Sequence, residues 1–162
     1  MPSTDDANSL ERLRQTYTLA LQTAGRQWRR AANTIAEAHG LSDAVALPLV
    51  MIGRLSGEPR QNALAEAVGI EGPSLVRLLD QLAAAGLVVR REDPSDRRAK
   101  VLALTPQGRD VVARVEVALK ALRAEVFAGI SQADLEASLR VFAALQRHDR
   151  GADAAPAREP AP

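Results

Sequence analysis

The chain has 162 residues, of which 46% are hydrophobic and 25% are charged, and its formal net charge is +1. These values are ordinary for a globular domain, and the near-neutral charge excludes a protein that coats nucleic acid through bulk positive charge. The chain has no cysteine, which excludes disulfides, thiolate metal sites and thiol-based redox sensing.

Residues 1–8 are polar, and we expect them to form a flexible N-terminus. They contain no apolar run, so we expect no signal peptide. A bilayer-spanning helix needs roughly 18 or more consecutive apolar residues, and the sequence has no such run. We therefore expect a cytoplasmic protein with no membrane partner.

Three helices are predicted in the first part of the chain. Apolar side chains recur at steps of three and four over residues 9–40, which is typical of a long amphipathic helix that ends near Gly40. A second helix is expected over residues 42–55, where Ser-Asp can cap its start. A short third helix follows at residues 61–68, and Gly69 ends it.

A fourth helix is predicted over residues 73–85. Pro73 suits its first turn, and Gly86 suits its end. The helical period predicts an inner, apolar face made of Val76, Leu79 and Ala83. It predicts an outer, polar face made of Ser74, Arg77 and Gln81.

Residues 93–100 are the most informative stretch of the chain. They lie between two short aliphatic segments, 87–91 and 101–104, which predict two strands joined by a turn. The turn carries three cations in four positions: Arg97, Arg98 and Lys100. A helix followed by a basic β-finger predicts a mainly α fold with a small β-hairpin wing, in which residues 41–105 form a winged helix-turn-helix DNA-binding domain. The cations could also protect the hairpin edge, a role compatible with DNA binding.

The C-terminal part is predicted to hold two more helices. Thr105-Pro106 can begin the first, and Ser131 with Asp134 makes a capping-box-like start for the second. The first carries a coiled-coil-like apolar seam: Val112, Val115, Leu119, Leu122 and Val126. We expect residues 9–40 and 106–149 to be dimerisation helices of a homodimer, and residues 150–162 to be a disordered tail.

These motifs resemble the MarR (multiple antibiotic resistance regulator) family, and within it the SlyA-like branch. The resemblance covers roughly residues 10–148, and its sharpest matches lie at 64–71, 73–77, 79–82, 86–87, 96–100 and 104–105. Trp28-Arg29 also matches the first helix of that branch. The resemblance implies a homodimeric transcription regulator that binds near-palindromic double-stranded DNA. Most members repress, and many release DNA when a small, often aromatic anion binds.

The resemblance assigns the base-reading role to the helix at 73–85. The DNA-contacting residues that we expect on it are Pro73, Ser74, Arg77 and Gln81. An exposed Arg in the first turns can reach O6 and N7 of guanine. The alternative for Arg77 is a solvated side chain paired with Asp80 or Gln81.

In the wing, we expect one of Arg97 and Arg98 to enter the minor groove and the other to contact phosphate. We also expect Lys100 to contact the DNA. Asp96 is expected to fix the shape of the wing by accepting hydrogen bonds. One of Arg90 and Arg91 must face the helices, where we expect a salt bridge more often than a DNA contact.

The resemblance implies a ligand pocket between the long helices and the winged domain. We expect Trp28 and Val50 in this pocket, with Arg29 as the cationic contact and Arg26 in reserve. The sequence departs from the SlyA-like branch at Ala46 and Val50, where that branch has an aromatic residue and a His, so its salicylate-type contacts are not carried over. The alternative is that Trp28 fills the core or a dimer interface.

We weigh three further functions. An enzyme is not expected, because the sequence has no nucleophile elbow, phosphate loop, metal-ligand spacing or acid paired with a His, and no cofactor or metal is expected either. One alternative is a ligand-independent, SlyA-like activator or anti-silencer that competes with nucleoid proteins on the bacterial nucleoid. Another is a winged helix used for protein docking.

Overall fold

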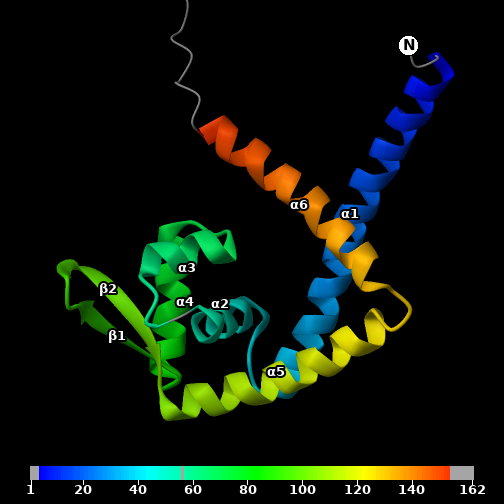
Figure 1. Ribbon diagram of the computed structural model, residues 1–162. Helices are drawn as coiled ribbons and strands as arrows, with labels where there is room; N and C mark the ends of the chain where they lie inside the picture. The colour runs from blue at the N-terminus through cyan, green and yellow to red at the C-terminus, as the bar shows by residue number, and fades with distance from the viewer. Residues whose placement is uncertain (1–3, 56, 154–162) are drawn as a thin grey trace, which may run out of the picture. The chain divides into compact units, whose positions relative to one another are not determined.

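The computed structural model describes residues 4–55 and 57–153, but not the side chains of Arg97, Arg98 and a few residues near the two ends (Figure 1). The chain divides after Ala121 into two compact units, here called unit 1 and unit 2. The elements, in chain order, are α1 (Thr4–Ala38), α2 (Asp43–Arg54), α3 (Gln61–Val68), α4 (Gly72–Ala84), β1 (Val88–Asp93), β2 (Asp96–Leu104), α5 (Pro106–Val126) and α6 (Gln132–Asp153).

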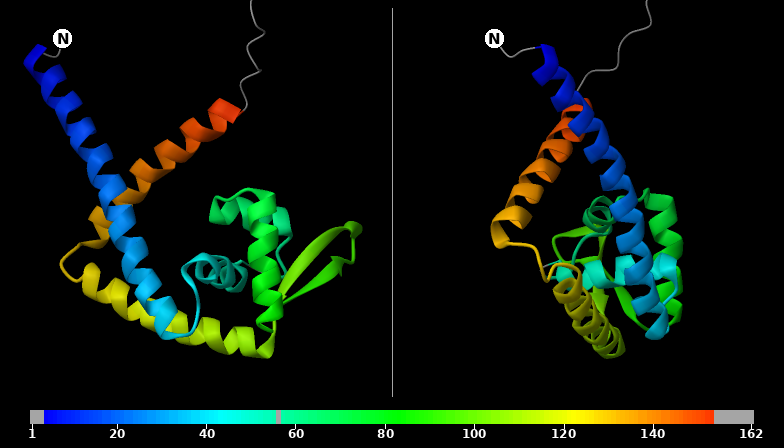
Figure 2. Two further views of the ribbon diagram at one scale, coloured as in Figure 1. Left: turned by 180° about the vertical axis from the view of Figure 1, so that it is seen from behind. Right: turned by 90° about the vertical axis from the view of Figure 1, so that its right-hand side faces the viewer.

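The core of unit 1 is built around α2, which packs against α1, α3, α4 and β2 (Figure 2). Its centre consists of fully buried leucines: Leu49, Leu64, Leu75, Leu79, Leu82 and Leu102. Aliphatic side chains therefore form this core, in keeping with an aromatic content of only 2%. The predicted winged helix-turn-helix is confirmed, since three helices are followed by an antiparallel hairpin that projects from them (Figure 1).

The capping residues in the sequence predicted most of the helix ends correctly. Gly69 ends α3 in the left-handed region, with φ of 73°, and its N–H bonds to Ala65 and Glu66 carbonyls. Pro73 lies in the first turn of α4. Thr105 caps α5, because its Oγ1 accepts a hydrogen bond from Gly108 N–H at 2.9 Å. Ser42 precedes α2 as expected, but its side chain makes no capping hydrogen bond.

The predicted inner face of α4 is confirmed at Leu79 and wrong at Val76 and Ala83. Leu75, Leu79 and Leu82 are buried, whereas Val76 is 37% exposed and Ala83 is exposed. Both sets of residues follow steps of three and four, so periodicity alone cannot choose between them. The leucine set is the bulkier one and removes more apolar surface from water.

The wing turn is much shorter than predicted. The strands run to Asp93 and from Asp96, so the turn is Pro94-Ser95 alone, and Arg97, Arg98 and Lys100 belong to β2. The reason is local: the Asp93 carboxylate accepts a hydrogen bond from Ser95 N–H at 2.8 Å, which closes a tight turn.

Three of the five residues of the predicted α5 seam lie inside unit 1 rather than on a free surface, whereas Leu122 is half-buried and Val126 is exposed in unit 2. Val112, Val115 and Leu119 are buried in the core of the same chain. Gly53 of α2 allows the close approach, because a Cβ there would meet Val112 Cγ1 at 2.9 Å. The predicted coiled-coil use of these three residues is therefore wrong.

In unit 2, Ser131 begins α6 with the predicted capping pair, since Asp134 N–H donates to Ser131 Oγ at 3.2 Å. The apolar side chains of α6 are exposed: Leu135, Leu139, Phe142 and Leu145.

The ends of the chain differ from the predicted boundaries. Helix α1 already begins at Thr4, within the segment expected to be flexible, and α6 runs to Asp153, past the expected limit at 149. Residues 154–162 of the predicted tail lie outside the described residues. In the described part of the chain, no single helix is long and apolar enough to span a bilayer. Helices α1 and α2 meet that criterion only together, across an 88° bend.

Candidate nucleic-acid interface and ligand cavity

Helix α4 presents its polar face to solvent. Ser74, Arg77 and Gln81 are all exposed, and so is Pro73 at its start. Asp80, the partner considered for Arg77, is held instead by Arg90, with Nη2 and Oδ1 2.6 Å apart. Among the side chains that the structure describes, none pairs with Arg77. Its guanidinium is therefore available to a ligand.

Arg90 joins the wing to α4. Besides Asp80, its Nη2 donates to the carbonyl oxygen of Val76 at 3.3 Å. This contact confirms the expectation that one of the two strand arginines makes a salt bridge toward the helices. Arg91 pairs with Glu58 at 2.8 Å. Because Arg90 neutralises Asp80, the acidic residue nearest to Arg77 adds little net negative charge to the outer surface.

The tip of the wing is organised by a carboxylate that the sequence analysis missed. Asp93 is only 7% exposed. It accepts hydrogen bonds from Ser95 Oγ at 2.6 Å, Ser95 N at 2.8 Å and Arg60 Nε at 2.7 Å. These hydrogen bonds, above all those from Ser95, lower the pKa of Asp93 to about 2 against the opposing effect of burial. The sequence signal was Asp93-Pro94-Ser95, because an Asp side chain can accept a hydrogen bond from the backbone N–H two residues later and so close a turn.

A polar groove separates the wing from the start of α3. Its volume is about 340 Å³, and it is lined by Arg60, Gln61, Asn62, Asp96, Ala99 and Lys100. Lys100 Nζ lies 3.4 Å from Glu92 Oε1, a loose pair on the exposed strand. The wing is fixed beside α3 because Leu102 N–H donates to the carbonyl oxygen of Pro59 at 3.0 Å. The side chains of Arg97 and Arg98 lie outside the described residues.

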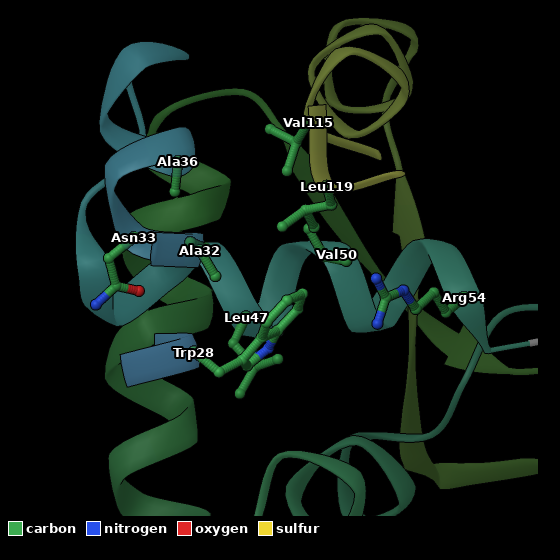
Figure 3. A pocket seen from close by; sticks show the side chains of 10 residues that line it. Trp28, Ala32, Asn33, Ala36, Leu47, Val50, Arg54, Val115 and Leu119 are labelled. Carbon is green, nitrogen blue, oxygen red and sulfur yellow. The ribbon is translucent and has the colours of Figure 1, made fainter. Parts of the chain in front are cut away.

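A second, apolar cavity lies between α1, α2 and α5 (Figure 3). Its volume is about 100 Å³. It is lined by Trp28, Ala32, Asn33, Ala36, Ala46, Leu47, Val50, Arg54, Val115 and Leu119. All of these residues belong to unit 1. The cavity combines one aromatic ring, one cation and mostly aliphatic walls, the usual make-up of a small-molecule site.

The structure brings only some of the predicted ligand residues to this cavity. Trp28 and Val50 line it, but Arg29 and Arg26 do not. Arg29 lies one turn before the lining residue Asn33, but its own side chain is exposed and does not reach the cavity. Arg26 donates instead to Thr23 Oγ1 at 3.1 Å.

The cation of the cavity is Arg54, which the sequence analysis did not single out. Its Nε donates to Glu116 Oε1 of α5 at 2.6 Å. The two residues are far apart in sequence, so no local pattern could have found the pair.

Comparison with known proteins agrees with this fold. A sequence model of the MarR family matches residues 39–99. The chain is 33% identical to the transcriptional regulator PA3341; the match covers 83% of this chain and 98% of that one, with a TM-score of 0.78.

Two further solved structures come from Rhodococcus. A MarR-family transcriptional regulator from Rhodococcus sp. RHA1 is 26% identical, with 82% of this chain and 94% of that chain covered and a TM-score of 0.70. CouR from Rhodococcus jostii RHA1, solved with p-coumaroyl-CoA bound, is 27% identical, with coverages of 80% and 90% and a TM-score of 0.73. Together with the winged helix-turn-helix fold, these matches show that the chain belongs to the MarR family of transcriptional regulators.

Proposed function

We propose that this protein is a homodimeric repressor that binds a near-palindromic operator and releases it when a small aromatic anion binds. The observation that carries the proposal is the state of Arg77 on the outer face of α4. Its side chain is exposed, and no described side chain pairs with it. Arg90 holds the wing against the same helix. We place the protein in the cytoplasm, on the bacterial nucleoid.

The DNA contacts follow from this arrangement. Arg77 would bind O6 and N7 of a guanine in the major groove, with Ser74 and Gln81 contacting neighbouring bases or phosphates. Pro73 sets the start of the helix. Lys100, at the edge of the polar groove, would contact the backbone. We keep the prediction that Arg97 or Arg98 enters the minor groove, and the prediction that Asp96 helps to shape the wing.

The dimer is proposed from the exposed apolar side chains of α6, which a second copy would cover. Two copies related by a two-fold axis present two α4 helices to two half-sites, which explains a near-palindromic operator. The half-sites would be about 34 Å apart, one turn of DNA.

The ligand response is proposed from the cavity and from a relative. CouR was solved with an aromatic acyl thioester bound, and the cavity of this chain has an aromatic residue and a cation in its wall. A ligand changes operator affinity only if it binds the DNA-competent and the released conformations unequally. A coupling of roughly 1–3 kcal/mol between the two sites is typical of such regulators.

The test is operator binding by the full-length protein. Duplexes covering the promoter of its own gene are titrated by fluorescence anisotropy, then challenged with a panel of phenolic and pyridine carboxylates and, separately, with peroxide. We expect a sequence-specific complex that at least one of the acids weakens.

Three other results are informative. A specific complex that no acid affects would support the SlyA-like, ligand-independent alternative instead. Release by peroxide but by no acid would contradict ligand sensing. The absence of any specific complex would contradict the whole proposal.

A further inference from the structure

Helix α4 carries one exposed valine among its large apolar side chains. Leu75, Leu79 and Leu82 are fully buried, whereas Val76 is 37% exposed. A single exposed valine is ordinary on a protein surface, so its meaning depends on where it lies. This one lies in the first turns of the helix that is proposed to enter the major groove.

The wing holds Val76 at the surface. Arg90 of β1 reaches across to α4, where its Nη2 donates to the carbonyl oxygen of Val76 at 3.3 Å and lies 2.6 Å from Asp80 Oδ1. Turning α4 to bury Val76 would break both contacts and would move the fully buried Leu75 and Leu79 toward solvent. The exposure of Val76 is therefore fixed by the core on one side of the helix and by the wing on the other.

Val76 lies between two proposed DNA contacts. Arg77 is the next residue of the helix, and it is exposed. Val76 and Asp80 are one turn apart and share the side of α4 that Arg90 approaches from the wing. Helix α4 packs against β1, and the hairpin projects beside that helix (Figure 1). A duplex that contacts both Arg77 and the wing therefore passes over Val76.

The base edges in the major groove offer an aliphatic side chain one apolar group. All four base pairs display hydrogen-bond donors and acceptors there, and thymine adds a C5 methyl group. Neighbouring residues have Cα atoms about 3.8 Å apart, and neighbouring bases of one DNA strand are about 3.4 Å apart along the helix axis. Val76 is therefore placed for the base pair next to the one that Arg77 contacts.

We propose that Val76 is a specificity-determining residue that reads the C5 methyl group of a thymine, at the base pair next to the guanine bound by Arg77. The inference rests on the proposed operator binding and extends the direct reading of each half-site to a second base pair. The two residues read different chemistry. Arg77 forms hydrogen bonds, and Val76 makes an apolar contact that favours thymine over cytosine, which lacks the methyl group.

The experiment removes the methyl group from the DNA. In the site that the unmodified protein selects from a random pool, each thymine is replaced in turn by deoxyuridine, which keeps the base pairing and lacks only the C5 methyl group. Affinities of the full-length protein are measured by fluorescence anisotropy at one salt concentration. We expect a loss of about fourfold, which corresponds to one buried methyl group, at one thymine in each half-site. That thymine should lie next to the guanine whose preference is relaxed in Arg77→Ala.

Three variants assign the loss to Val76, after unfolding curves have established that each is folded. Val76→Ala should bind the thymine-containing site several-fold more weakly and show no further loss with deoxyuridine at the sensitive position, because the same contact is already absent. Val76→Ile keeps a branched aliphatic side chain and should keep the sensitivity. Val89→Ala is the matched control: Val89 is 36% exposed, and as the neighbour of Arg90 in β1 it points to the hairpin face away from α4. Its sensitivity to deoxyuridine should equal that of the unmodified protein.

The outcomes separate this inference from the proposed function. If deoxyuridine weakens Val76→Ala as much as the unmodified protein at every thymine, or if no thymine beside that guanine is sensitive, the inference is wrong. A specific complex whose base preference depends on Arg77 would then leave the proposed function standing. If no duplex from the pool is bound specifically, the proposed function fails and the inference fails with it.

Discussion

Single residues decide how the basic wing is held. Asp93 closes the two-residue turn through Ser95 and reaches across to Arg60, the residue that immediately precedes α3. One carboxylate thus fixes both the shape of the wing tip and its position beside the second helix of the DNA-binding motif. Arg90 also fixes the position of the wing, because its ion pair with Asp80 joins β1 to α4. The proposed DNA contacts depend on these ties because Arg77 and the wing must fit one duplex together.

The first prediction concerns Asp93 and pH. Folding lowers its pKa from the usual 3.8 to about 2, so the ionised carboxylate stabilises the fold above about pH 4 and loses this effect as the pH falls toward 2. The free energy of unfolding of Asp93→Asn, measured by denaturant titration, should lie below that of the unmodified protein at pH 6, and the difference should shrink between pH 4 and pH 2. Ser95→Ala, which removes the strongest hydrogen bond but keeps the carboxylate, should move that loss to higher pH. A difference that stays constant with pH would contradict the account.

At the level of elements, α5 is built into the winged unit. Gly108 lies so close to the α4–β1 connection that a Cβ there would meet the carbonyl oxygen of Leu87 at 2.0 Å. Further along α5, Val112, Val115 and Leu119 are buried in the core of unit 1. The part of α5 that lies in unit 1 is therefore packed against the winged helix-turn-helix.

The second prediction tests that close packing. Gly108→Ala should destabilise the protein by roughly 1–3 kcal/mol or more, because the new methyl group meets backbone that cannot move aside. Gly25→Ala is the matched control: nothing lies within 4 Å of a Cβ at that helical position, so it should stabilise by roughly 0.5–1 kcal/mol. Thermal and denaturant unfolding measure both. Equal stability of the two variants would show that α5 is not packed as described.

The sequence predicted the helix ends, which depend on neighbouring residues. It missed the buried face of α4 and the cavity wall, which depend on contacts between residues far apart in the chain. Gly69, Thr105 and Ser131 act within one helical turn, and the helix ends they predict are confirmed. The choice between Leu75 and Val76 for the inner face of α4 depends on which set packs against α2. Arg54 owes its place in the cavity wall to packing between α1, α2 and α5, and no spacing along the chain encodes that packing.

At the scale of the whole molecule, the third prediction is that the protein is a homodimer. It rests on the exposed apolar face of α6, where Leu139 is 63% and Phe142 is 37% exposed. Replacing both by Asp should give monomers or unfolded protein in sedimentation velocity runs, because two charges would be buried in the interface. Ala144→Asp adds one charge on the opposite side of α6 and should remain dimeric. A stable monomer of the unmodified chain would contradict the proposal.

Substitutions on the proposed DNA-binding surface should cause two kinds of defect. Lys100→Ala removes a backbone contact, so it should weaken all duplexes alike and lower the salt slope of binding by about one. Arg77→Ala removes a base contact, so it should change which sequences are preferred.

The most direct test of the DNA-binding surface is the base preference of Arg77→Ala, compared with that of the unmodified protein. Duplexes are selected from a random pool, and the affinity for each single-base variant of the selected site is measured at one fixed salt concentration. We expect Arg77→Ala to lose roughly 1–3 kcal/mol of binding free energy and to relax the preference for guanine at one position in each half-site. Arg14→Ala, an exposed arginine of α1, should change neither. If Arg77→Ala selects the same sequence with the same affinity, α4 does not read the operator through Arg77, and the proposed DNA-binding surface is wrong.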